Sequence, residues 1–388
     1  MSGEFGRGNE GVGRAPPATC VGAYGAASNV QRCWELGEYS LLYQQLVDFM
    51  TSVLDGDQLP FEIRSDRGRK IAVRNVAPRG LKNLTSYFDQ CRTLMDLYWP
   101  DYAYTADFQL FFDCYREHLF GQWGLGRNPN ALYANDLLEA EMFNDFVAYL
   151  RRQAIERGVR AKLWELRKRG VQYQYEAIDR WFEFDIPKGG RLLPVRVDLY
   201  YQEAAVTYQD AMPRTGWRLG AFGDWVQVPV AANAWGGMAE HRSRFDVRAA
   251  LRDREAFFGS RNAELFNSLA GYVCKLEMGG DRHAYHFHAL FLFYASPGYG
   301  VPHWVNLIDG HWRRVTGGQG LVYDCSARSD RHALEQRGLW ALDSLVSGDA
   351  QQLAKLKHYV LNYFAKDEQM LRVKPTPKAR TLTTGRIC

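Results

Sequence analysis

Two histidines separated by one residue, His286 and His288, are the most informative chemical feature of the sequence. They lie in the stretch 283–294, which we interpret as a strand. Because side chains at positions i and i+2 of a strand share a face, both imidazoles would point the same way and Phe287 the other. Such a pair can hold one metal ion from a rigid sheet, although an isolated pair is more often two structural histidines.

A carboxylate close to this pair favours the metal interpretation. Glu277 lies nine positions before His286, and the intervening Gly279-Gly280-Asp281 is typical of a turn. The preceding stretch 271–278 alternates between two faces, and Glu277 belongs to the more polar one. An antiparallel hairpin would therefore bring Glu277 beside both histidines, and such mixed nitrogen and oxygen ligation suits Mg²⁺ or Mn²⁺. His283 is a possible substitute ligand, although a turn histidine is the simpler interpretation.

Two tyrosines further along the chain could supply a nucleophile. Lys355, Tyr359, Tyr363 and Lys366 follow one another in steps of four, four and three, which places them on one face of a helix expected from about 350 to 371. A tyrosine hydroxyl with a pKa of about 10 is a weak nucleophile at neutral pH, but a lysine can stabilise the phenolate. A metal ion would polarise a scissile phosphate, and attack would leave a phosphotyrosine ester. The alternative is an amphipathic face of packed tyrosines flanked by lysine stems.

The elements that would position these residues divide the chain into four parts. Residues 1–35 are rich in glycine and predict a flexible tail, and residues 36–186 predict a mostly helical N-terminal region. Residues 187–375 carry the alternating strands and the tyrosine helix, beginning with the alternation at 195–201, which predicts a half-buried strand. Residues 376–388 predict an irregular basic tail.

Composition narrows the classes of protein that are possible. Of the 388 residues, 46% are hydrophobic and 14% aromatic, which is ample for a buried core and excludes a largely disordered chain. No apolar run approaches the roughly 20 residues of a membrane helix, and no secretory signal is visible. Seven cysteines without a C-x-x-C pair argue against a disulfide framework and a structural zinc site. We therefore expect a cytoplasmic protein without membrane contact.

The net charge of +4 is distributed unevenly. Residues 151–170 and residues 351–388 each hold eight Lys/Arg against two Asp/Glu, a local charge of +6 in each block. Such blocks suggest contact with a polyanion such as DNA, although a solvated basic helix face is the simpler alternative. No G-x-x-x-x-G-K-[ST] loop is present, so an NTPase motor of that type is not expected in the chain.

The order of these motifs resembles a known family. A His–hydrophobic–His pair followed by Tyr–hydrophobic–x–Lys, here 363–366, is similar to the HUH endonucleases that initiate rolling-circle replication. The closest resemblance is to the replication initiators of inoviruses and inovirus-like prophages, and it covers about residues 190–388. It is carried by 195–199, by 271–277 with 285–288, by 363–369 running on to Arg372, and to a lesser extent by 311–318.

The resemblance implies a role for each candidate residue. His286 and His288 would be metal ligands with Glu277 as the third, Tyr363 would be the nucleophile and Lys366 would assist it. Tyr359 has the spacing of the second nucleophile in two-tyrosine initiators. Asp198, in the first strand motif, is expected to be structural.

The resemblance also implies a fold and a function. We expect an α+β catalytic domain, with a central antiparallel sheet that carries the histidine pair, flanking helices, and the tyrosine helix over the metal. The chain would nick one DNA strand at an origin through a 5′-phosphotyrosine intermediate and rejoin DNA at the end of replication. Its partners would be duplex and single-stranded origin DNA and a host helicase in the bacterial cytoplasm.

Other functions remain open on the sequence alone. A related HUH transposase would use the same motif order, and a non-catalytic DNA-binding regulator would need only the basic blocks. Nucleotide hydrolases with His-x-His-x-His are disfavoured because the third position is Leu290. A zinc deaminase would need H-x-E and P-C-x-x-C, and neither is present.

Overall fold

The computed structural model describes residues 35–36, 38–98, 102–123, 128–133, 136–201, 204–205, 215–219, 225–229, 247–259, 263–279, 284–327, 331–365 and 371–386. The expected flexible tail at 1–35 lies outside the described residues except for its last position. His283 and Lys366 also lie outside them.

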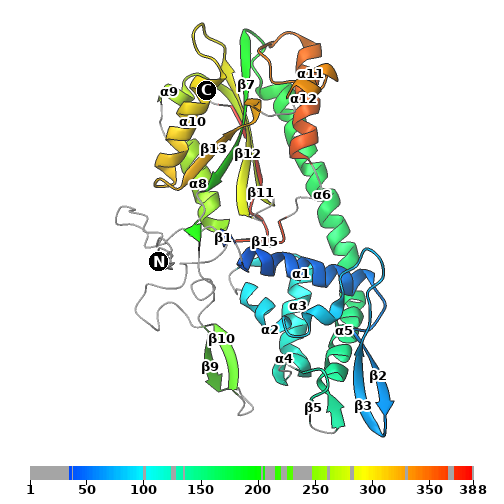
Figure 1. Cartoon of the computed structure of the whole chain (residues 1–388). Coiled ribbons are helices and arrows are strands. Elements are labelled where there is room, and N and C mark those ends of the chain that lie inside the picture. Colours follow the sequence, from blue (N-terminus) through cyan, green and yellow to red (C-terminus); the bar gives the residue numbers. More distant parts are fainter. Residues whose placement is uncertain are drawn as a thin grey trace, which may run out of the picture.

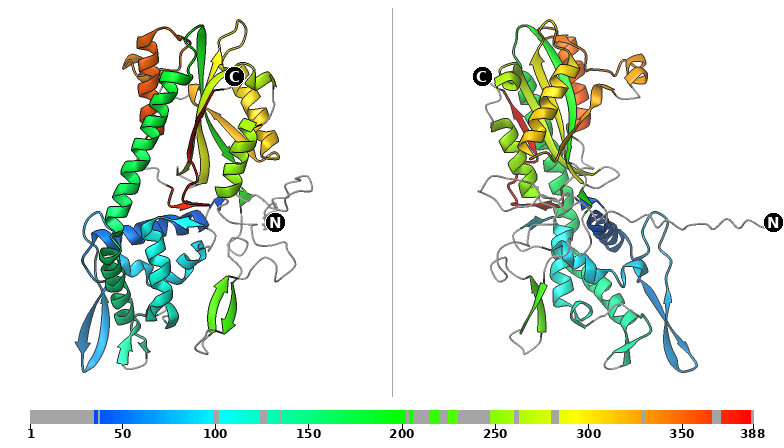
Figure 2. Two further views of the ribbon diagram at one scale, coloured as in Figure 1. Left: turned by 180° about the vertical axis from the view of Figure 1, so that it is seen from behind. Right: turned by 60° about the vertical axis from the view of Figure 1, so that its left-hand side comes forward.

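A helical part and a sheet-containing part are joined by one long helix (Figure 1). The main helices of the first part are α1 (Glu38–Asp55), α3 (Ala106–Glu117) and α5 (Glu139–Glu156), and the long helix α6 (Val159–Arg180) follows. Figure 2 shows α6 running from these helices to the sheet in two further views. The two parts have separate cores, because the helical core draws its buried residues from 42–159 and the cores around the sheet from 178–382.

The sheet is antiparallel throughout and has the strand order β13-β7-β12-β11-β16, with the short strand β14 also pairing with β7. With helices packed on it, this sheet confirms the expected α+β class with a central antiparallel sheet. Its strands are β7 (Arg191–Tyr201), β11 (Leu269–Gly279), β12 (Ala284–Tyr294), β13 (Gly320–Asp324), β14 (Leu345–Val346) and β16 (Leu382–Gly385).

Different helices cover the two faces of the sheet. Alternate residues of β7, β11 and β12 pack with α8 (Val247–Gly259) and α10 (Val301–Val315) on one face, where Phe287 and Phe291 are fully buried. The intervening residues face α12 (Ala350–Phe364) and the end of α6. Figure 1 shows α8 and α10 on one side of the strands and α12 on the other. The histidine pair shares the α12 face with Leu290 and Leu292, because strand side chains alternate.

Strand β7 differs from the half-buried strand that its alternation predicts. It lies between β12 and β13 inside the sheet, and side chains on both of its faces are buried, although Tyr200 near its end is exposed. Arg196 is 1% exposed and Asp198 8% exposed, although these are the positions expected to face solvent. The prediction is wrong because helices that are distant in sequence cover the polar face of the strand.

The N-terminal region is mostly helical, as expected, but it also contains a β-hairpin. Strands β2 (Phe61–Asp66) and β3 (Arg69–Arg74) pair in antiparallel register. The two-residue turn Arg67-Gly68 has φ values of 48° and 78°, the left-handed conformation of a type I′ turn. The expectation of helix therefore fails locally where a two-residue turn joins two short alternating segments.

The C-terminal segment is more ordered than expected. Helix α12 ends at Phe364 rather than at about 371. Strand β15 (Val373–Lys374) pairs with β4 (Ala103–Tyr104) of the helical part, and β16 then pairs with β11 at the edge of the sheet. The interpretation of 376–388 as an irregular tail is therefore wrong at 382–385, where the chain completes the sheet.

Within the described ranges, no helix combines the length and apolar content that a membrane crossing requires.

The remaining elements are short. The minor elements are β1 (Glu35–Leu36), η1 (Leu84–Tyr87), α2 (Cys91–Leu94), η2 (Met95–Leu97), α4 (Leu119–Trp123), β5 (Leu132–Tyr133), β6 (Leu137–Leu138), η4 (Trp181–Asp185), β8 (Ala204–Ala205), β9 (Thr215–Leu219), β10 (Trp225–Pro229), α9 (Ala263–Phe266), η6 (Cys325–Ala327) and α11 (Arg331–Gln336).

Candidate metal centre

The hairpin of β11 and β12 brings the three predicted ligands together. Its register pairs Glu277 directly with His286 and Lys275 with His288. All four residues lie on the α12 face of the sheet, because directly opposed residues of an antiparallel pair point to the same side. The prediction that the hairpin would place Glu277 beside the histidine pair is confirmed.

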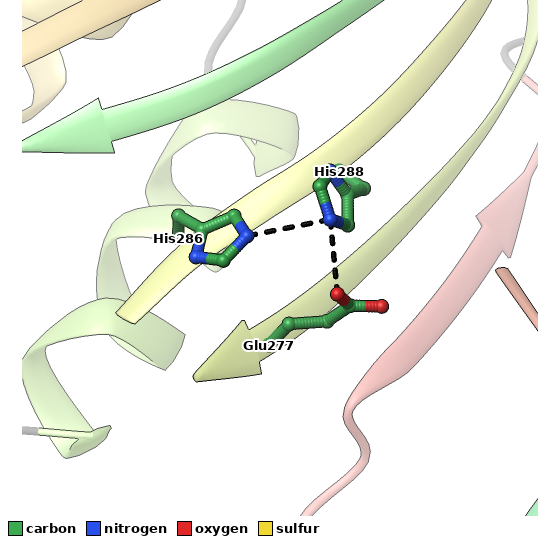
Figure 3. A group of neighbouring side chains, drawn as sticks. All are labelled: Glu277, His286 and His288. Atoms are coloured by element: carbon green, nitrogen blue, oxygen red, sulfur yellow. Dashed lines mark hydrogen bonds and ion pairs between the residues drawn. The ribbon is translucent and has the colours of Figure 1, made fainter. Parts of the chain in front are cut away.

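The ligand atoms of these residues converge on one point (Figure 3). The Nε2 atoms of His286 and His288 lie 3.3 Å apart, and His288 Nε2 lies 2.9 Å from Glu277 Oε2. One ligand atom from each of the three residues lies within 4.8 Å of the other two. Glu277 and His286 are buried and His288 is partly buried, and all three lie on the paired strands β11 and β12.

This donor set fits a divalent metal ion. Adjacent ligands of an octahedral ion with bonds of about 2.1 Å lie about 3 Å apart. Two of the three separations, 3.3 Å and 2.9 Å, are close to this spacing, and the ligand atoms of Glu277 and His286 lie within 4.8 Å of each other. Two imidazoles and one carboxylate leave further coordination positions for water or a substrate oxygen.

Two residues of the neighbouring strand β7 lie next to the Nδ1 atom of His288, on the side of the ring away from Glu277. The Nδ1 atom of His288 lies 2.5 Å from Asp198 Oδ1 and 3.0 Å from Arg196 Nη2. The carboxylate of Asp198 can only accept and the guanidinium of Arg196 can only donate, so a protonated Nδ1 donates its hydrogen bond to Asp198 and makes none with Arg196. This arrangement leaves Nε2 to face Glu277. A carboxylate in this position fixes the ring of a metal-binding histidine. Asp198 thus has a positioning role, in agreement with its expected structural rather than ligating role.

The charges around the site stabilise one another. Burial alone would raise the pKa of Asp198, but its hydrogen bond to His288 and the charge of Arg196 lower it to about 2. Burial likewise opposes ionisation of Glu277, yet His288 and Lys275 hold its pKa below the usual range. For His288, burial would lower the pKa, and the carboxylates of Asp198 and Glu277 raise it instead. The cluster is therefore a compact set of paired charges in a poorly solvated setting.

A buried lysine belongs to the same cluster. Lys275 is 1% exposed, and its Nζ lies 2.9 Å from Glu277 Oε1, while Glu277 Oε2 faces His288. Oε1 of Glu277 therefore pairs with the ammonium group of Lys275, while Oε2 points towards the candidate metal position. The lysine therefore holds the carboxylate in place.

The predicted tyrosines lie on the helix that covers this face of the sheet. Tyr359 is 8% exposed and Tyr363 is partly buried, and their rings lie 5.0 Å apart. The guanidinium carbon of Arg196 lies 4.9 Å from the centre of the Tyr363 ring, so one residue contacts both the nucleophile candidate and His288. Lys355 is exposed two turns before Tyr363 on the same helix, and Lys366 falls outside the described residues.

Arg196 and Lys275 were not singled out from the sequence as parts of the site. Arg196 stands two positions from Asp198 and Lys275 two positions from Glu277, so each lies on the same strand face as its neighbour. That spacing is the signal that could have identified them. Both are 1% exposed, and the burial of Arg196 against Tyr363 and Phe364 of α12 could not be read from local alternation.

Comparisons of the chain with models of known families, with curated proteins and with solved structures find no match. Its function must therefore be inferred from its own residues.

Proposed function

We propose that this chain is a metal-dependent DNA strand transferase that nicks one strand through a tyrosine nucleophile and later rejoins it. One observation carries the proposal. The cluster of Glu277, His286 and His288 lies on the sheet face covered by the helix of Tyr359 and Tyr363, and Arg196 contacts residues of both groups. A purely structural histidine pair would need neither a facing carboxylate nor a nearby tyrosine.

The metal site would hold Mg²⁺ or Mn²⁺, with His286, His288 and Glu277 as ligands. When bound, such an ion polarises a phosphate and offsets the charge that develops during substitution at phosphorus. Asp198 keeps the His288 ring oriented, and Lys275 keeps the Glu277 carboxylate oriented. These residues limit the movement of the ligands, which favours a productive geometry.

The chemical step would be a transesterification. The Oη atom of Tyr363 forms a bond to phosphorus while the bond from phosphorus to the 3′ oxygen of the preceding nucleotide breaks. The phenol loses its proton, and the departing 3′ oxygen gains one. The product is a 5′-phosphotyrosine ester and a free 3′ hydroxyl, and attack by a 3′ hydroxyl reverses the step.

Arg196 and Lys366 would support the nucleophile. The positive charge of Arg196 beside the Tyr363 ring stabilises negative charge on the phenolate. Lys366, three residues after Tyr363 in the sequence, is proposed to assist the nucleophile. Tyr359 packs against Tyr363 and could act as a second nucleophile when the strand is rejoined.

The biological setting follows from the resemblance of the motifs. We place the activity in the initiation and termination of rolling-circle replication, with origin DNA as substrate and a host helicase to separate the strands. A transposase that uses the same chemistry is the alternative within the class. The DNA ends that are joined in the cell distinguish the two.

The test uses labelled single strands that tile the DNA flanking the chain's own coding sequence, incubated with Mn²⁺ or Mg²⁺. We expect a covalent protein–DNA adduct with the wild-type chain and none with Tyr363→Phe. Tyr173→Phe, which alters an exposed tyrosine on α6, is the matched control and should leave the adduct intact. Nicking that survives the double change at Tyr359 and Tyr363 would contradict the proposal and leave a DNA-binding role.

A further inference from the structure

Helix α6 is unusually exposed for its length. Of its 22 residues only Val159 and Ile178, near its two ends, are buried. Between these anchors the helix crosses from the helical part to the sheet (Figure 1). Side chains between them are at most partly buried, as Leu163 is against the helical core. An exposed helix without an apolar stripe is usually polar all round, but this one carries large aromatic residues.

Basic and aromatic side chains share one face of α6. With a rotation of about 100° per residue, the six positions from Arg160 to Tyr175 that are named below fall within about 100° of the helix circumference. Trp164 is 61% exposed and Tyr175 is 50% exposed, so neither ring is packed in a core of the protein. We call this face the α6 stripe. Its basic and aromatic members are Arg160, Trp164, Arg167, Lys168 and Tyr175, and the partly buried Val171 lies between them.

The stripe leads towards the tyrosine helix. Trp164, Val171 and Ile178 follow one another in steps of seven and therefore lie along one line of the helix. Ile178 is buried in the core that also contains Tyr359. One residue further on, Asp179 forms an ion pair with Lys357 of α12. The stripe thus ends where α6 meets the helix that carries Tyr359 and Tyr363.

We propose that the α6 stripe binds single-stranded nucleic acid and leads the strand towards α12. Exposed aromatic rings stack on unpaired bases, and neighbouring cations contact the phosphates. The stripe has both, with Lys168 Nζ lying 4.9 Å from the ring centre of Trp164. A duplex would use the cations but not the rings, because its bases are already stacked. Binding itself stands independently of the proposed function, and only delivery of the strand to Tyr363 rests on it.

The test measures binding of a fluorescent oligothymidylate single strand to the full-length chain in EDTA, where metal-dependent nicking cannot occur. Trp164→Ala and Tyr175→Ala should each weaken binding about tenfold, as expected for loss of one stacked base. Lys168→Glu should also weaken binding and reduce the salt dependence by about one phosphate contact, a slope change of about 0.7 on a single strand.

The opposite face of α6 offers matched controls. Tyr173 is 45% exposed and Lys162 is exposed, and both point away from the stripe at 100° per residue. Tyr173→Ala and Lys162→Glu make the same chemical changes as Tyr175→Ala and Lys168→Glu and should alter binding less than twofold. All of these side chains are exposed, so circular dichroism and thermal melting should show every variant folded.

Two results would overturn the proposal. Equal losses of affinity in the stripe variants and in their controls would show that binding depends only on the general charge or the stability of the helix. Equal affinity for a duplex of the same length would remove the role of the aromatic rings. A third outcome separates the two proposals. If the nicking test fails but the stripe variants alone lose binding, the stripe is still a binding surface and only the strand-transferase function is contradicted.

Discussion

At the scale of single residues, the site depends on how firmly its ligands are held. Glu277, His286 and His288 provide the ligand atoms, while Asp198 and Lys275 each fix one of them through a buried contact. A buried charge that loses its partner is costly, because the remaining group keeps its desolvation penalty. The outer residues should therefore affect metal binding almost as clearly as a ligand does.

Replacing a ligand should separate catalysis from DNA binding. We expect His286→Ala to abolish adduct formation and to weaken Mn²⁺ binding by at least tenfold, because one of three protein ligands is lost. Binding of single-stranded DNA in EDTA should remain within about twofold, since the stripe lies on α6. Calorimetry with Mn²⁺ and an anisotropy titration measure the two effects. Tight Mn²⁺ binding by the variant would remove His286 from the site.

Replacing Asp198 tests the positioning of His288. In Asp198→Asn the side chain keeps its size but loses the charge that holds the Nδ1 proton. We expect Mn²⁺ affinity to fall about 10- to 100-fold, the range seen when such outer partners of a metal-binding histidine are changed. Calorimetry on Asp198→Asn and on the control Asp324→Asn, on the neighbouring strand, measures the difference. Unchanged affinity in both would show that Asp198 does not position the ring.

At the scale of elements, the proposed activity depends on α12 lying over the metal face of the sheet. Leu356 and Val360 on this helix are fully buried against the sheet core, and Arg196 lies beneath the Tyr363 ring. The ligands themselves come from the hairpin of β11 and β12. Docking of the helix and assembly of the metal site should therefore be separable.

Leu356→Ala tests this separation. Truncating a fully buried leucine should lower the free energy of unfolding by about 2–5 kcal/mol. We expect weaker adduct formation with Mn²⁺ affinity close to that of the wild type. Chemical denaturation, calorimetry and the adduct assay provide the readouts, with the exposed Gln351→Ala as the control on the same helix. Loss of Mn²⁺ binding in a folded Leu356→Ala protein would show that the helix forms part of the metal site.

The elements also show which features were predictable from sequence. The hairpin and its ligands were predictable because a glycine-rich turn and two alternating strands define the register locally. The burial of Arg196 was not predictable, because it lies against Tyr363 and Phe364 of α12, more than 150 residues further along the chain. The edge strand at 382–385 is short and polar, and it exists only through pairing with β11.

At the scale of the whole molecule, the helical part holds the segment that follows the tyrosine helix. Arg372 forms a buried ion pair with Asp107, and its carbonyl oxygen accepts a hydrogen bond from Thr105 N at 2.9 Å. Its own N–H donates to the Tyr43 hydroxyl at 3.2 Å. The pairing of β15 with β4 extends this contact. The helical part, for which the sequence predicted no role, thus anchors the chain beyond Tyr363.

Asp107→Asn tests this anchor. The change leaves Arg372 without its buried counter-charge and should lower the free energy of unfolding by about 3 kcal/mol. We expect slower adduct formation and unchanged Mn²⁺ affinity, because the metal ligands lie in the other part of the molecule. Asp113→Asn on the same helix, where the ion pair with Arg157 is more exposed, is the control. Equal effects of both changes would argue against a specific anchor.

The identity of the modified residue tests the central claim most directly. A covalent adduct formed with single-stranded DNA and Mn²⁺ can be digested with nuclease and trypsin and then sequenced by mass spectrometry. Cleavage after Lys357 and Lys366 gives one peptide, 358–366, that contains both tyrosines, so fragment ions must assign the nucleotide. The account predicts a phosphate ester on Tyr363, and an adduct on a residue other than Tyr363 or Tyr359 would contradict it.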